Sequence, residues 1–285
     1  MRRAFSLSAP LLLLVLSVYV SLNYLPETQR LKALLSSQVT LIELPRIDVI
    51  YRELSSPDDI VSVQCESVLP VTYTKVVSLS SLQPAERKRR FIDLLLPSVL
   101  IANYEVVRTR ENLTRVLEKL KMRYKLSRAE RDFVESMLDR CKADSIEEVL
   151  LKANPVPPSL VVAQAAVESG WGTSRFFVEG NNLFGMWAFK DKSKVIEAKE
   201  SKVHLKRYDS ILEAVRDYIY NVNVGWAYSE FRKHRRKSFD PLELSEFLSF
   251  YSIEREKYVK KIRRIIEKNG LTELDYCILD PSYIR

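Results

Sequence analysis

The sequence predicts a mainly α-helical protein of the α+β class with one small β-hairpin. Apolar residues recur at helical spacing in several segments between residues 81 and 268, which is typical of amphipathic helices. Residues 189–208 instead alternate weakly between apolar and charged side chains, and this pattern predicts a short polar hairpin. Four of the six glycines lie within residues 167–187, so we expect the chain to turn sharply there, at the end of an apolar helix.

The N-terminal segment has the form of an export signal. Arg2 and Arg3 precede an apolar run from Ala9 to Leu25, which just reaches the roughly 17–25 residues that a membrane-spanning helix needs. No clean small-residue cleavage site follows, which favours an uncleaved anchor over a removed signal peptide. The two arginines would hold their end of the chain in the cytoplasm. We therefore expect residues 1–25 to be a membrane anchor or signal, and the rest of the protein to work outside the cytoplasm.

The next part of the chain is predicted to be a linker followed by a helical extension. Residues 26–80 mix prolines with short β-branched runs, a composition typical of a linker with short extended segments. Residues 81–154 are predicted to form the extension. Its first helix begins near Pro84, and Pro97 should kink or break that helix because proline removes a backbone hydrogen bond.

Two shorter helices complete the predicted extension. The first, in residues 126–141, is amphipathic. The second lies in residues 145–153, with Ser145 in the N-cap position and acidic residues behind it. Residues 154–158 read NPVPP, which stops the helical pattern and predicts a domain boundary.

The C-terminal domain is expected at residues 155–275, with residues 276–285 as a tail. Ser159 is predicted to cap a short, almost wholly apolar helix, and Gly170 stands where such a helix ends. A helix that is apolar on all faces is buried. Further helices are predicted in residues 210–221, 241–250 and 254–268, the last of them ended by Asn269 and Gly270.

Composition excludes several classes of function. The formal charge of +8 favours polyanionic surroundings such as an acidic wall polymer, anionic lipid or nucleic acid. Nucleic acid is disfavoured because the chain is exported and its basic cluster, residues 232–237, has no aromatic platform beside it. No glycine-rich phosphate loop and no Cys or His cluster is present, so we expect no nucleotide cofactor and no metal.

The sequence contains three cysteines: Cys65, Cys141 and Cys277. They allow one disulfide, but their spacing alone does not show which two of them pair.

Glu168 is the candidate catalytic residue. It stands at the open end of the apolar helix, and Trp171 follows it closely. Burial in such surroundings raises the pKa of a carboxyl, because it disfavours the charged form. A glutamic acid that stays protonated can donate a proton to a leaving oxygen, which glycosidases require. The alternative is that Glu168 only accepts hydrogen bonds from backbone amides of the following loop.

The motifs around Glu168 resemble a known family. Residues 168–172 read ESGWG, Ser174 follows, and residues 181–185 read NNLFG. Together with the later motifs, this order resembles the β-N-acetylglucosaminidase domains of bacterial cell-wall hydrolases, and is most similar to the Bax-type proteins of Gram-negative bacteria. The resemblance covers about residues 155–270. The later motifs are YDS at residues 208–210, EAVRDY at residues 213–218 and YSIEREKY at residues 251–258.

The resemblance implies a lysozyme-like helical fold and an endo-β-N-acetylglucosaminidase. Such an enzyme cuts the glycan strand of peptidoglycan after N-acetylglucosamine, with Glu168 as general acid and no cofactor. Peptidoglycan glycan strands would be the partner, and the protein would be periplasmic, held to the inner membrane by its N-terminal segment.

The resemblance also suggests substrate-binding residues, for several of which a structural role is an alternative. Trp171 either packs in the core or lines the cleft as a sugar platform. Asn181 and Asn182 either cap the next turn or hold acetamido groups. Phe184, Gly185 and Tyr258 belong to the same motifs and are expected at the substrate.

The sequence does not assign the second catalytic group. The family often places another carboxylate in the hairpin, and this chain offers Glu197 and Glu200 there. If neither acts, the acetamido group of the substrate could assist instead. Tyr251 either stabilises the reacting sugar or packs in the core. Two alternative functions also remain: a lytic transglycosylase, and a glycan-binding envelope protein that cuts poorly or not at all.

Overall fold

A computed structural model describes residues 46–188, 195–197 and 204–285. The predicted anchor or signal in residues 1–25, and the linker up to residue 45, lie outside this part of the chain. Within the described residues, no helix is both long enough and apolar enough to cross a membrane.

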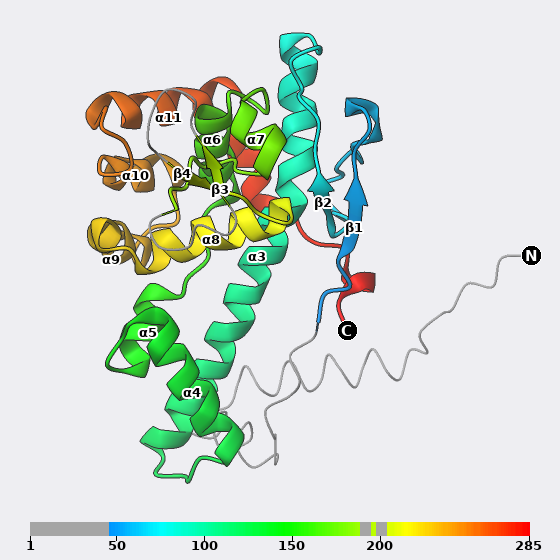
Figure 1. Cartoon of the computed structure of the whole chain (residues 1–285). Coiled ribbons are helices and arrows are strands. Elements are labelled where there is room, and N and C mark those ends of the chain that lie inside the picture. The colour runs from blue at the N-terminus through cyan, green and yellow to red at the C-terminus, as the bar shows by residue number, and fades with distance from the viewer. Residues whose placement is uncertain (1–45, 189–194, 198–203) are drawn as a thin grey trace, which may run out of the picture.

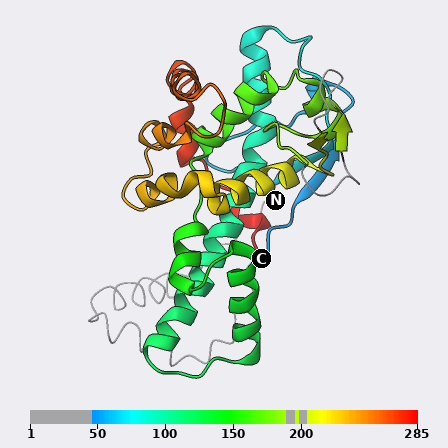
Figure 2. The ribbon, with the colours of Figure 1, turned by 60° about the vertical axis from the view of Figure 1, so that its left-hand side comes forward.

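Helices make up most of the described chain, which confirms the predicted mainly α-helical class with little strand (Figures 1 and 2). The strands form two pairs, β1 with β2 in parallel and β3 with β4 antiparallel. In chain order, the elements are β1 Ile50–Glu53, β2 Val71–Lys75, α3 Pro84–Lys121, α4 Arg128–Cys141, α5 Ile146–Lys152, α6 Pro158–Ser169, α7 Arg175–Gly180, β3 Val195–Glu197, β4 His204–Lys206, α8 Ile211–Val224, α9 Ser229–Arg235, α10 Pro241–Ser245 and α11 Glu256–Lys268.

Helix α3 runs the length of the molecule (Figure 1). It begins at Pro84, as predicted, but Pro97 does not break it, because the chain stays helical to Lys121. A proline inside a helix costs about 3 kcal/mol or more. Pro97 and its neighbours are buried against the rest of the protein, so packing outweighs that cost.

The two halves of α3 belong to two hydrophobic cores. The first half packs with α6, α8 and the residues around them in what we call the main core. The second half packs with α4 and α5 in a smaller extension core, built from Leu113, Val116, Cys141, Ile146, Val149 and Ala153. In Figures 1 and 2, this extension projects from one end of the molecule.

Helices α4 and α5 form where the sequence predicts them. Ser145 accepts a hydrogen bond from the amide of Glu148 and caps α5, which confirms that prediction. Ser127 caps α4 in the same way, and Glu130 completes a capping box by accepting from the amide of Ser127.

Residues 46–80 differ from the linker that composition suggests. The expected short extended segments are present as β1 and β2, but their side chains are part of the main core. Val71 and Tyr73 are almost fully buried there. Removing the large apolar area of such side chains from water stabilises the fold. A disulfide joins Cys65 to Cys277 and leaves Cys141 as a free, buried thiol.

Helix α6 is capped by a different residue from the one predicted. Ser159 lies inside the first turn, and Pro157 occupies the N-cap position. The amide and the hydroxyl of Ser159 both donate to Asp275, at 2.8 and 2.7 Å. A carboxylate from a distant part of the chain therefore accepts a hydrogen bond from a backbone amide at the start of α6, which is the role that the sequence predicts for a local serine. Gly170 ends the helix in a left-handed conformation, as predicted.

The remaining predicted elements are present within the described residues. Strands β3 and β4 pair antiparallel, with Val195 opposite Lys206, which confirms the hairpin where it is described. Ser210 caps α8, and Gly270 follows α11 in a left-handed conformation. The predicted helix of residues 241–250 is divided into α10 and a 3₁₀ turn, Glu246–Leu248.

Candidate active site

Glu168 lies in the last turn of α6 and is partly buried. The apolar sequence of this helix places it inside the main core, and Glu168 lies where the helix leaves that core. Burial raises the pKa of Glu168, and the negative charge of Glu254 acts in the same direction. A hydrogen bond from Tyr258 and the positive charge of Lys261 oppose that shift, but the pKa remains above its ordinary value.

The loop after Glu168 is built from left-handed residues. Gly170, Trp171 and Gly172 have φ angles of 59°, 57° and 77°. Glycine takes this conformation at little cost, whereas tryptophan does so only when its surroundings hold it. The turn is fixed further by the Ser169 hydroxyl, which accepts from the amide of Gly172 at 3.1 Å. The concentration of glycine in this stretch therefore reverses the chain immediately after the carboxylate.

Trp171 packs towards α3. Its ring meets Phe91 edge-on, with 5.6 Å between the ring centroids. The ammonium of Lys88 lies 5.4 Å from the centre of the indole ring. Of the two roles considered for Trp171, this geometry favours packing against the main core.

Asn181 and Asn182 hold the backbone of the site. Asn181 ends α7 in a left-handed conformation and donates to the carbonyls of Thr74 and Tyr208, both at 3.0 Å. Asn182 donates to the carbonyls of Met186 and Lys206 and accepts from the amide of Met186. Since both amides are engaged with backbone groups, the structural role is favoured over recognition of acetamido groups.

Four tyrosines gather around Glu168. Tyr251 and Tyr258 stack with 5.4 Å between their ring centroids, and Tyr218 stacks on Phe184 at 4.2 Å. Tyr228 approaches Tyr251 at 6.4 Å. Burial raises the pKa of all four tyrosines, and the negative charge of Glu168 contributes to the rise in each of them, so all four lie near this carboxylate.

Buried hydrogen bonds fix this tyrosine cluster. The side chain of Gln164, one turn before Glu168, donates to the Tyr258 hydroxyl at 3.0 Å and accepts from the Tyr218 hydroxyl. Tyr251 donates to the carbonyl of Phe184 at 3.0 Å. Burial raises the pKa of Tyr228 to about 12, so its hydroxyl remains protonated and able to donate.

A groove with a volume of about 880 Å³ runs past this cluster. Phe184, Gly185, Tyr228 and Tyr251 line it. Gly185 has a φ of 63°, and a Cβ atom added to it would lie 3.5 Å from Oε2 of Glu168. The absence of a side chain at this position therefore opens the groove directly beside the carboxylate.

Asp217 is a groove residue that the sequence analysis did not single out. Its Oδ2 accepts from Lys206 Nζ at 2.7 Å and from the Tyr208 hydroxyl. The only sequence signal was the position of Asp217 within the EAVRDY motif. Because the carboxylate is held by a cation and a phenol, it stabilises the wall of the groove between α8 and β4.

The two hairpin acids are not located as side chains. Glu197 ends β3, and its backbone is paired with His204. Glu200 lies outside the described residues. Their proposed part in the reaction therefore stays a prediction. Among the residues that the structure describes, no group of three or more His, Cys, Asp or Glu side chains is placed to hold a metal ion.

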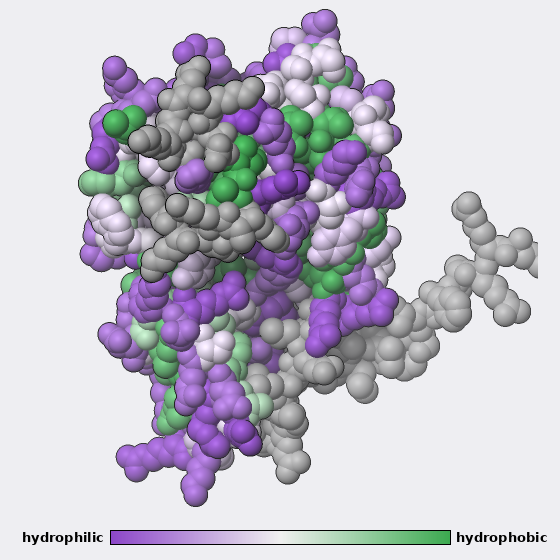
Figure 3. All heavy atoms as spheres, in the orientation of Figure 1, coloured by the Kyte–Doolittle hydropathy of each residue, from purple (hydrophilic) through white to green (hydrophobic). Residues whose placement is uncertain are grey.

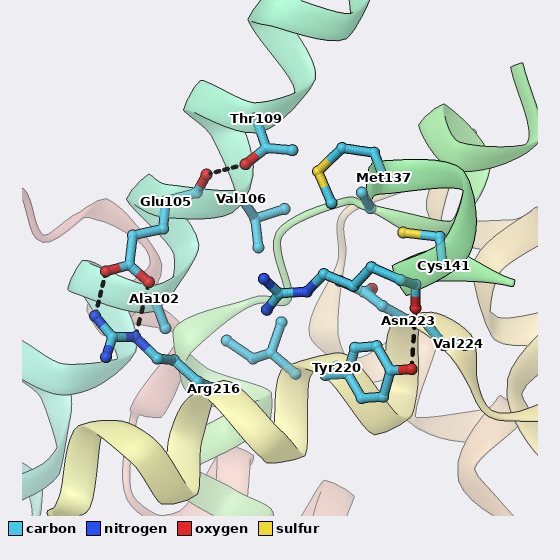
Figure 4. Close-up of a pocket in the computed structure, with 13 residues that line it drawn as sticks. Ala102, Glu105, Val106, Thr109, Met137, Cys141, Arg216, Tyr220, Asn223 and Val224 are labelled. Carbon is cyan, nitrogen blue, oxygen red and sulfur yellow. Dashed lines mark hydrogen bonds and ion pairs between the residues drawn. The ribbon is translucent and has the colours of Figure 1, made fainter. Parts of the chain in front are cut away.

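A smaller pocket of about 140 Å³ lies between α3, α4 and α8 (Figure 4). Figure 4 shows Met137 and Cys141 on one side of it and the ion pair of Glu105 with Arg216 on another. Burial raises the pKa of the Cys141 thiol, which keeps it in the unreactive protonated form. This pocket is small and is not lined by the residues next to Glu168, whereas Gly185, Tyr228 and Tyr251 line the groove, so we assign the candidate site to the groove.

Comparisons with known proteins find similarity over part of this chain. The glucosaminidase family model, described as mannosyl-glycoprotein endo-beta-N-acetylglucosaminidase, matches residues 145–271. Protein bax of Escherichia coli is 39% identical over 87 residues, which are 30% of this chain and 31% of that protein. The exo-glucosaminidase LytG of Bacillus subtilis is 28% identical over 151 residues, 45% of this chain and 49% of LytG. The matches thus span less than half the length of either relative.

One solved structure adds a more distant match. The catalytic domain of the autolysin Auto from Listeria monocytogenes is 22% identical, with 53% of this chain and 89% of that domain covered and a TM-score of 0.36. The family match contains Glu168 and the tyrosine cluster. Residues 145–271 of this chain therefore match the glucosaminidase family, and parts of the chain are similar to Protein bax and to LytG.

Proposed function

We propose that this protein is a peptidoglycan hydrolase that cleaves the glycan strand after N-acetylglucosamine, with Glu168 as general acid. The observation that carries the proposal is the position of Glu168. Its carboxyl has a raised pKa and is surrounded by tyrosines, and Gly185 leaves the groove open beside it. The match of residues 145–271 to the glucosaminidase family and the similarity to the exo-glucosaminidase LytG support a glucosaminidase activity.

In the proposed reaction, protonated Glu168 donates its proton to the glycosidic oxygen as the bond to the sugar breaks. A carboxyl with a raised pKa holds that proton closer to neutral pH than an exposed one does. The attacking group is either water activated by Glu197 or Glu200, or the acetamido oxygen of the substrate.

The groove residues divide into two roles in this proposal. Phe184, Gly185, Tyr251 and Tyr258 meet the substrate, because they lie beside Glu168 or line the groove. Three other residues do not meet the substrate in this proposal but stabilise the loops that carry the groove residues: Trp171, Asn181 and Asn182.

A periplasmic location fits the same proposal. The disulfide between Cys65 and Cys277 needs an oxidising compartment to form and persist. The sequence of residues 1–25 supplies an export signal, and we propose that it anchors the protein in the inner membrane.

Two alternatives share the site. A lytic transglycosylase would use the same single acid and release an anhydro product, which mass spectrometry of the released fragments distinguishes from hydrolysis. A glycan-binding protein without turnover would keep the groove and lack a functional second group. Digestion of purified sacculi by the wild-type protein separates that case from both enzymes.

The test of the proposal is Glu168→Gln. The amide keeps the size of the side chain but has no transferable proton, so sacculus digestion should fall by roughly 10²–10⁴-fold, the range of general acid catalysis. Glu230→Gln is a matched control, because Glu230 lies in an exposed ion pair with Lys233. A folded Glu168→Gln protein that digests sacculi at nearly the wild-type rate would show that Glu168 is not the acid.

A further inference from the structure

Two aromatic side chains are exposed next to the groove. Trp226 is 82% exposed and Phe250 is 57% exposed. Their rings contact each other in an edge-to-face arrangement, with 6.3 Å between the centroids. The guanidinium of Arg255 lies 4.6 Å from the centre of the Phe250 ring. A tryptophan so exposed, paired with a second ring and a cation, is typical of a binding surface.

The pair stands close in sequence to residues of the groove. Trp226 stands two residues before Tyr228, in the 3₁₀ turn Trp226–Tyr228 that joins α8 to α9. Phe250 directly precedes Tyr251. Tyr228 and Tyr251 both line the groove. Neither ring lines the groove itself, but each comes from a segment that also carries a groove-lining tyrosine, so the pair lies close to the groove.

The backbone on both sides of the pair is held by hydrogen bonds. The buried guanidinium of Arg232 donates to the carbonyl of Gly225 at 2.7 Å, immediately before Trp226. A Cβ atom on Gly225 would lie 2.6 Å from the carbonyl oxygen of Asn221, so the turn is tightly closed. The Tyr251 hydroxyl is bonded to the carbonyl of Phe184. The rings are thus presented to solvent by fixed turns.

We propose that Trp226 and Phe250 form a platform for a sugar residue of the glycan strand, outside the position where the strand is cut. This inference rests on the proposed function. Rigid aromatic faces contact the apolar C–H face of a pyranose ring at low entropic cost. Arg255 adds a fixed set of donors beside the rings, suited to a sugar hydroxyl or to a carboxylate carried by the sugar.

The platform acts on binding and not on the reacting atoms. A contact made equally in the ground state and in the transition state lowers KM without changing kcat. The platform should therefore matter for long strands, which reach it, and not for a fragment too short to do so.

The test compares Trp226→Ala and Phe250→Ala on long glycan strands and on a tetrasaccharide fragment of peptidoglycan. We expect each variant to raise KM for long strands about three- to tenfold, with kcat unchanged and the tetrasaccharide unaffected. Tyr276→Ala is the matched control, because Tyr276 is 85% exposed and does not line the groove. An unchanged KM, an equal loss on both substrates, or an equal effect of Tyr276→Ala would overturn the platform.

A second measurement separates this inference from the proposed function. Binding of long strands is measured by pull-down in the Glu168→Gln background, alone and combined with Trp226→Ala. Loss of binding on adding Trp226→Ala supports the platform even if Glu168→Gln remains active, an outcome that would reject only the acid. Trp226-dependent binding to phosphatidylglycerol vesicles, without binding to strands, would assign the rings to lipid and overturn the proposal.

Discussion

The extension core and the main core bury polar residues in different settings. In the extension, the buried Glu130 completes the capping box at the start of α4 and pairs with Lys119. Figure 3 shows mainly hydrophilic side chains over this lower part of the molecule. The main core instead buries Gln164, Tyr218 and Tyr258 in one hydrogen-bonded network next to Glu168.

This difference supports the main core as the region of the candidate site. A buried polar group destabilises the folded state unless its hydrogen bonds are satisfied. A buried polar network is therefore a sign of a functional site. The capping box of the extension stabilises the start of a helix. The main core instead holds titratable groups with raised pKa values around the carboxylate of Glu168. Helix α3 contributes to both cores, so it ties the two regions together.

The largest effect should come from removing the disulfide, which packs with Val68, Leu96 and Leu100 in a small cluster beside the main core. Replacing Cys65 and Cys277 by Ala should lower the free energy of unfolding by about 2–5 kcal/mol, since the crosslink spans 212 residues of sequence and constrains the unfolded chain. Cys141→Ala, in the extension core, should cost only about 1 kcal/mol. Denaturant unfolding measures both. If the disulfide variant and Cys141→Ala lose the same free energy of unfolding, the crosslink contributes no more stability than the buried free thiol of the extension.

A smaller effect is expected when the tyrosine network is cut. Tyr258→Phe removes the hydroxyl that bonds Gln164 and Glu168, at a cost of about 1–3 kcal/mol in unfolding free energy. That hydroxyl lowers the pKa of Glu168, so its loss should raise the pKa further. The acid acts when protonated, and activity falls as pH rises through its pKa. The descending limb of the activity profile should therefore move to higher pH.

Tyr73→Phe is the control for this substitution. The buried Tyr73 hydroxyl accepts from the amide of Val61 at 3.0 Å, in a part of the main core that does not contact Glu168. Stability should fall to a comparable degree, with no movement of the pH profile. If Tyr258→Phe leaves the profile in place as well, the network has no influence on the acid.

The smallest effect concerns matched helix caps. Ser127→Ala, at the start of α4 in the extension, should cost about 1 kcal/mol and leave kcat on sacculi unchanged. Ser174→Ala removes the corresponding cap of α7, which leads into the NNLFG motif, and should cost the same stability while lowering kcat. Thermal melts and turnover measurements separate the two quantities. A fall in kcat for Ser127→Ala would mean that the extension takes part in catalysis.

The sequence by itself determined the features that depend on neighbours along the chain. The helices around residues 126–141, 145–153 and 254–268 follow from apolar spacing and from residues such as Ser145 and Gly270, whose effects reach only one turn. Glu168 was predicted for the same reason, since the apolar helix before it and the glycines after it are all local.

Only the tertiary structure decided the features that join distant segments. Cys65 pairs with Cys277 across 212 residues, and Ser159 finds its partner in Asp275. The tyrosines around Glu168 come from α8, α11 and the turns between them, and no local pattern shows that they converge. These contacts depend on how helices pack, and packing is set by the apolar area and shape of whole surfaces. Sequence spacing therefore points to Glu168 as a candidate acid, but the packing of the fold determines which groups surround it.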